Sequence, residues 1–86
     1  MEPDIGMKNQ RGLIVPIKWD KAGKIIGISL CINTEEEYPI VNRGAFYNDL
    51  INLVQQMVVV TGNVEIDQKG KKTLHVEDFR MSYITE

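Results

Sequence analysis

The chain has 86 residues, of which 43% are hydrophobic and 26% charged, with a formal net charge of -2 and a pI near 5.4. This length predicts one domain with a modest core, and the composition excludes an intrinsically disordered chain. The acidic balance excludes a nucleic-acid-binding surface that covers the whole protein, so any such surface must be a local patch.

The first ten residues mix proline, glycine and polar residues without a period, which predicts a flexible N-terminal tail over 1–10. Residues 11–20 then predict a strand, because side chains alternate along it. The face that is expected to meet the core carries Leu13, Val15, Ile17 and Trp19. Pro16 lacks a backbone N–H and therefore indicates an edge position or a β-bulge.

A glycine-containing turn leads into a second predicted strand over 24–33, whose large aliphatic residues fall on one face. The acidic residues 34–37 predict a turn, and a short third strand is expected over 38–41. Residues 45–56 predict the one convincing helix, because their apolar residues form a stripe with helical spacing. Asparagine is a weak helix former, so packing of Leu50 and its neighbours must hold this helix.

The clearest pattern is a long β-hairpin over 57–79, in which β-branched residues alternate on two strands around a turn at Gly70. The core-facing set on its first strand is expected to be Val58, Val60, Gly62, Val64 and Ile66. The second strand contributes Leu74 and Val76. Residues 81–86 are expected to form a C-terminal extension, so the predicted domain covers 11–80.

The order of three strands, a helix and two strands, with short connections, predicts antiparallel neighbours and a sheet that curls to protect its edges. At this point the chain resembles the oligonucleotide/oligosaccharide-binding (OB) fold. The resemblance rests on the helix expected at 45–56, and on a Val-x-Gly-x-Val segment over 60–64 that precedes a glycine turn and a second apolar strand. It implies a mainly β, five-stranded Greek-key barrel over roughly 11–80, with one helix between strands three and four.

The resemblance also implies a ligand site on the outer face of strands two and three, gripped by the loop after strand one and the loop between strands four and five. The residues expected to contact phosphates are Lys18, Lys21, Lys24, Lys69, Lys71 and Lys72. Tyr38, on strand three, is expected to stack against a base. Lysine-rich turns are also typical of well-solvated loops, and cross-strand packing is the alternative use for Tyr38, so both interpretations stay open.

The remaining reactive side chains form no catalytic or metal-binding constellation. Cys31 and His75 are each the only residue of their type, so neither completes a disulfide or a metal set, and no nucleophile motif accompanies the histidine. We therefore expect no enzyme activity, no cofactor and no metal. Trp19 is expected to pack in the core or at the end of a barrel. The single cysteine, an N-terminus without secretory-signal features and the lack of a long apolar run predict a cytoplasmic protein that does not enter membranes.

These features favour a non-enzymatic binding module that holds single-stranded DNA or RNA weakly and with little sequence preference. The alternative is a protein-interaction or assembly module, which includes a homodimer. Its contact patch would consist of apolar residues on the faces opposite the predicted core, namely Ile14, Ile25 and Val59.

Overall fold

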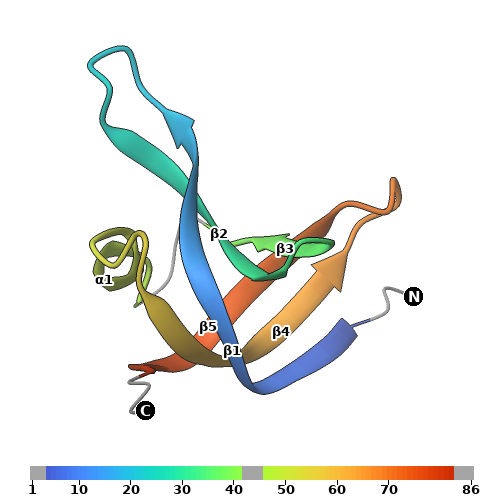
Figure 1. Ribbon diagram of the computed structural model, residues 1–86. Helices are drawn as coiled ribbons and strands as arrows, with labels where there is room; N and C mark the ends of the chain where they lie inside the picture. Colours follow the sequence, from blue (N-terminus) through green and yellow to red (C-terminus); the bar gives the residue numbers. More distant parts are fainter. Residues whose placement is uncertain (1–3, 42–45, 83–86) are drawn as a thin grey trace.

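The computed structural model describes residues 4–41 and 46–82, which form five strands and one helix (Figure 1). The elements, in chain order, are β1 (Asp4–Trp19), β2 (Ile25–Asn33), β3 (Glu36–Pro39), α1 (Tyr47–Ile51), β4 (Met57–Ile66) and β5 (Lys72–Met81). The four pairings between these strands are antiparallel and join them into one sheet. The predicted class, mainly β with a helix between the third and fourth strands, is therefore confirmed.

The central strand of the sheet is β1, and the strand order is β3-β2-β1-β4-β5. The half of β1 from Asp4 to Leu13 pairs with β4, and the half from Leu13 to Trp19 pairs with β2. The β1–β2 hairpin and the β4–β5 hairpin therefore diverge from the middle of β1. Figure 1 shows their turns pointing away from one another, with β3 between the two hairpins.

The strand β1 begins earlier than predicted. Residues 4–10, expected to belong to a flexible tail, form its first half and pair with β4, whereas residues 1–3 lie outside the described range. A β-bulge after Met7 contains Asn9, which takes a positive φ of 49° and donates its backbone N–H to the Thr61 hydroxyl at 3.1 Å. This bulge breaks the alternation of side chains, which is why the sequence pattern does not reveal the strand.

The two edges of the sheet approach one another at one point. Ile40, just after β3, forms an isolated parallel bridge with Leu74 of β5, and the Val41 N–H donates to the Leu74 carbonyl at 2.9 Å. No second pairing joins these edges among the described residues, so the sheet is not closed. At the C-terminal end, β5 reaches Met81, one residue beyond the predicted domain, and residues 83–86 lie outside the described range.

The core is a single cluster of aliphatic side chains from the strands and α1. Its fully or almost fully buried members are Ile14, Ile28, Leu30, Ile40, Leu50, Val58, Val60, Val64 and Leu74. The faces predicted to meet the core are confirmed at the centre of β2 and along β4, where apolar and polar or small residues alternate. Burial of these alternate residues is the main favourable contribution to stability.

The face predicted for β1 is wrong. Ile14 is fully buried, whereas Ile17 is 42% exposed and Trp19 is 53% exposed. Both faces of this strand carry large apolar residues, and two register shifts that follow Pro16 turn its end away from the core. Alternation alone therefore does not indicate which face is buried. The irregularity predicted at Pro16 is present as a register shift between Pro16 and Lys18.

The helix α1 covers Tyr47–Ile51, which is shorter than the predicted range 45–56 and lies toward its N-terminal end; residue 45 lies outside the described part of the chain. The backbone after the helix bonds to β1 instead of continuing the helix. The Gln55 N–H donates to the Ile14 carbonyl at 2.7 Å, and the Ile14 N–H donates to the Gln56 carbonyl at 3.1 Å. Gln55 takes a positive φ of 75°, which is incompatible with a right-handed helix.

Ser29 of β2 is fully buried, and its hydroxyl has no hydrogen-bond partner among the described residues. A buried polar group without a partner costs about 1–3 kcal/mol. We therefore expect Ser29→Ala to raise the free energy of unfolding by about 1 kcal/mol, measured by urea unfolding followed by circular dichroism. The control is Ser82→Ala, at a half-buried serine after β5, with an expected change within about 0.5 kcal/mol. A less stable Ser29→Ala variant would contradict the prediction.

Candidate functional site

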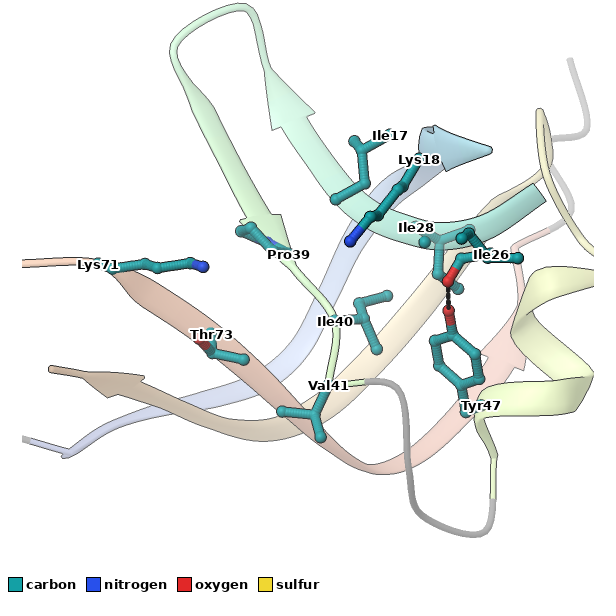
Figure 2. Close-up of a pocket in the computed structure, with 11 residues that line it drawn as sticks. Ile17, Lys18, Ile26, Ile28, Pro39, Ile40, Val41, Tyr47, Lys71 and Thr73 are labelled. Atoms are coloured by element: carbon teal, nitrogen blue, oxygen red, sulfur yellow. Dashed lines mark hydrogen bonds between the residues drawn. The ribbon is translucent and has the colours of Figure 1, made fainter. Parts of the chain in front are cut away.

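A pocket of about 390 Å³ lies where the stem of the β1–β2 hairpin, the end of β3, α1 and the start of β5 meet (Figure 2). We call this pocket the hairpin cleft. The lining residues that matter for its chemistry are Ile17, Lys18, Ile26, Pro39, Tyr47 and Lys71. The volume falls in the range of about 300–1,000 Å³ that is typical of pockets for small-molecule ligands.

The stem of the β1–β2 hairpin forms one wall of the hairpin cleft. The register shifts after Pro16 bend β1 there, and Lys18 lies opposite Gly27 of β2. A Cβ on Gly27 would come within 2.9 Å of the Lys18 Cβ, so only glycine allows the two strands to approach this closely. The bend leaves two aliphatic side chains in the wall partly open to solvent, because Ile17 is 42% and Ile26 is 39% exposed.

Two lysines bring positive charge into the hairpin cleft from opposite sides. Figure 2 shows the Lys18 and Lys71 ammonium groups both directed toward the space beside Pro39. None of the described lining residues is an aspartate or a glutamate. In the part of the chain that the structure describes, the one close contact between a basic and an acidic side chain is the hydrogen bond between His75 Nε2 and Glu65 Oε1, at 2.9 Å, so no carboxylate pairs with either cleft lysine. This arrangement suits a ligand that combines an anionic group with an apolar body.

Tyr47 connects α1 to the wall of the hairpin cleft. Its hydroxyl donates a hydrogen bond to the backbone carbonyl of Ile26 at 2.8 Å (Figure 2). Burial raises the pKa of Tyr47 above its usual value near 10, so the hydroxyl remains a donor at physiological pH. The bond fixes the stem of the hairpin against the helix. The sequence gives no sign of this role, because the partner is a backbone atom in a distant strand.

Comparisons with known proteins point to no family. No family model, curated protein or solved structure matches the chain. Over the two described segments, no three histidine, cysteine or acidic side chains cluster as metal ligands would. Nor does any helix there have the length and apolar character that crossing a bilayer requires. The interpretation of the hairpin cleft therefore depends on its own geometry and chemistry.

Two of the predicted lysines, Lys21 and Lys24, lie in the turn of the β1–β2 hairpin and do not line the cleft. The Asp20 carboxylate organises this turn by accepting the backbone N–H groups of Ala22 at 2.8 Å and Lys24 at 2.9 Å. Asp20 therefore stabilises the backbone of the turn. The two lysines lie in this exposed segment. These lysines therefore add positive charge beyond the cleft rather than inside it.

The β4–β5 turn has the same organisation. The Asp67 carboxylate accepts the backbone N–H groups of Lys69 at 2.9 Å and Lys71 at 2.8 Å. Because the two turns point apart in Figure 1, the predicted meeting of the two lysine loops takes place only at their stems. Of the predicted lysines, the structure brings Lys18 and Lys71 into one pocket and leaves the others outside it.

Tyr38 packs toward the core rather than standing on the outer face of the sheet. It pairs with Leu30, and because cross-strand partners share a face, its ring contacts the buried cluster. The Lys72 Nζ lies 5.6 Å from the ring centroid, and the Tyr38 hydroxyl donates to the Glu36 carboxylate at 3.4 Å. The pKa of Tyr38 is raised, chiefly by burial. The negative charge of Glu36 and its hydrogen bond with the hydroxyl contribute less. Tyr38 thus packs across strands, the alternative that the sequence left open.

Trp19 is the aromatic residue that the sequence prediction misplaced. Its side chain is 53% exposed, the highest value among the large apolar residues that the structure describes. Ile17 and Ile26, which are also exposed, lie on the same hairpin. Trp19 does not line the hairpin cleft but directly follows Lys18, which does. The available sequence signal is its place next to the glycine-containing turn, because Trp19 is the last residue of β1 and strand ends are less covered than strand centres.

Proposed function

We propose that the chain is an OB-type module that binds single-stranded nucleic acid in the hairpin cleft and catalyses no reaction. The fold part of this proposal is supported by the strand order and by the helix between β3 and β4. It is also supported by the parallel bridge of Ile40 with Leu74, which draws the two sheet edges together as a Greek-key barrel requires. The ligand part rests on one observation: Lys18 and Lys71 enter an otherwise largely apolar cleft without an acidic lining residue.

Charge neutralisation would supply most of the affinity. A lysine that contacts a phosphate releases bound counterions. For each such contact, the logarithm of the affinity for a single strand falls by about 0.7 per tenfold increase in salt concentration. The aliphatic wall formed by Ile17 and Ile26 offers an apolar surface to a base or a sugar. The lysines of the two turns extend the positive field outward, which favours encounter with a polyanion despite the net charge of -2.

The double variant Lys18→Glu/Lys71→Glu tests this function. We expect it to weaken binding of a labelled single-stranded oligonucleotide by about tenfold or more at low salt. The slope of log affinity against log salt concentration should fall by about 1.4, because two contacts of about 0.7 each are lost. Fluorescence anisotropy titrations at several salt concentrations measure both quantities.

The matched control is Lys8→Glu/Arg11→Glu, which makes the same change in net charge at exposed residues of β1 that do not line the hairpin cleft. We expect its affinity and salt slope to stay close to those of the unchanged protein. Equal losses in the two double variants would indicate an effect of bulk charge, and a lack of binding at the lowest salt concentration would rule out the proposed function.

A protein-interaction module is the second candidate, and exposed apolar surface on the β1–β2 hairpin favours it. The contact patch is not the predicted one, because Ile14 is fully buried, Ile25 packs against the core and Val59 is half-buried. The exposed set consists instead of Ile17, Trp19 and Ile26. A dimer that forms with rising concentration in light scattering would favour this candidate over nucleic-acid binding.

A further inference from the structure

We infer that Trp19 is a base-stacking residue, and that the ligand is a single-stranded oligonucleotide rather than a mononucleotide or a duplex. This inference rests on the function proposed above and names the ligand class of that site. It is carried by three observations on the β1–β2 hairpin: the exposure of Trp19, its place in the chain directly after Lys18, which lines the hairpin cleft, and the lysines that flank it in the sequence.

The exposure of Trp19 requires an explanation that core packing does not supply. Its side chain is 53% exposed at the end of β1. Tryptophan is highly buried on average in folded proteins. β1 ends at this residue and a turn follows, so Trp19 belongs to the β1–β2 hairpin, which projects from the rest of the molecule in Figure 1. An exposed flat ring of this size is a suitable surface for an unpaired base, since every base has a π face.

The position of Trp19 determines the length of the ligand. Lys18 lines the hairpin cleft and Trp19 does not, although their Cα atoms are only about 3.8 Å apart along the chain. A nucleotide that occupies the cleft therefore leaves the indole uncovered. A ligand that contacts both must continue out of the cleft along the hairpin, which a mononucleotide is too short to do.

The charge around Trp19 matches a phosphate backbone. Lys21 and Lys24 follow it in the exposed turn, and Lys18 precedes it. The Asp20 carboxylate accepts backbone N–H groups of that turn, so its charge is partly offset by hydrogen bonds. A single strand can place an unpaired base on the indole and its phosphates near these lysines. The bases of a duplex are already stacked within the helix and offer free faces only at its ends.

Trp19 is the only tryptophan in the chain, so its intrinsic fluorescence reports on this one position. The experiment titrates the protein with an oligonucleotide of about 12 nucleotides, within the length that one OB domain covers. Binding is followed by tryptophan emission and, with a labelled strand, by anisotropy. We expect quenching with the same midpoint as the anisotropy change, and no quenching by a mononucleotide or a blunt duplex at equal concentration.

Three variants separate stacking from other contributions. We expect Trp19→Ala to weaken oligonucleotide binding by about 5- to 150-fold, the usual effect of losing one stacked base. Trp19→Phe keeps a flat ring and should retain most of the affinity, whereas Trp19→Leu keeps only apolar bulk and should resemble Trp19→Ala. Thermal unfolding of each variant checks that the fold is intact, and the phenylalanine variant keeps the test informative if the alanine variant is unstable.

The possible failures are distinguishable. If the oligonucleotide binds but neither the Trp19 emission nor the affinity of Trp19→Ala changes, the inference is overturned and the proposed function stands. If a duplex quenches the emission as strongly as a single strand, the assignment of the ligand class is overturned. If no oligonucleotide binds at low salt, both fail. A response only to vesicles that contain anionic lipid would overturn both in favour of a membrane surface.

Discussion

Gly62→Ala is expected to lower the free energy of unfolding by about 3 kcal/mol or more, the largest loss that we expect from adding a single methyl group. A Cβ at this position would overlap the backbone carbonyl oxygen of His75 on the paired strand. The register shift between Thr61 and Gly62 brings the two backbones this close together. A backbone carbonyl cannot rotate away as a side chain can, so the β4–β5 ladder itself would have to shift.

The measurement is thermal unfolding followed by circular dichroism. One kcal/mol shifts the melting temperature of a domain of this size by about 4–8 °C, so a decrease of about 12 °C or more is expected. The matched control is Gly6→Ala on β1, where a Cβ would have no heavy atom within 4 Å. Its effect should stay within about 0.5 kcal/mol. Similar losses in the two variants would show that conformational freedom, and not the close approach to His75, makes glycine necessary.

Leu50→Ala is expected to cost about 2–5 kcal/mol, the usual range for truncating a buried leucine. Leu50 is the fully buried residue of α1 and holds the helix against the core. A helix of five residues has no stability of its own, so it depends on this packing. Loss of the anchor should also release the Tyr47 hydroxyl from the Ile26 carbonyl and loosen the wall of the hairpin cleft.

Urea unfolding measures the loss of stability. Oligonucleotide affinity, measured at a temperature where the Leu50→Ala variant is still folded, tests the effect on the cleft. Asn48→Ala provides the control, because Asn48 is exposed on the same helix, and its expected effect is within about 0.5 kcal/mol. If Leu50→Ala lowered the stability but left oligonucleotide affinity unchanged, the cleft wall would not depend on the packing of α1.

The sequence predicted the strands whose two faces differ in polarity. Along β4, valines alternate with polar or less buried residues, so the core face is evident, and the structure buries Val58, Val60 and Val64. Along β1, apolar residues occupy both faces and the direction of the strand changes after Pro16. Which face is buried then depends on the bend, and the bend depends on pairing with β2, which is not a local property of the sequence.

The candidate site was predictable only in part, for a related reason. Lys18 and Lys71 follow from the general position of the two hairpins, which the order of elements indicates. Trp19, expected in the core or at the end of a barrel, is exposed, whereas Tyr38 packs across strands, which is one of its two open interpretations. Exposure depends on strand curvature and on register rather than on residue type. Tyr47 was missed because its partner is the backbone carbonyl of residue 26. Every residue type supplies this acceptor, so the identity of the residue at that position gives no signal.

The central place of β1 has a consequence for the order in which the protein is made. The β1–β2 hairpin needs only neighbouring residues and can form early during synthesis, but the first half of β1 pairs with β4, which emerges from the ribosome much later. Pairings between distant segments also form slowly. We therefore expect the first half of β1 to stay unpaired in the nascent chain until β4 has been synthesised. The twist that the bulge at Asn9 gives to this strand makes it a poor template for a neighbouring nascent chain.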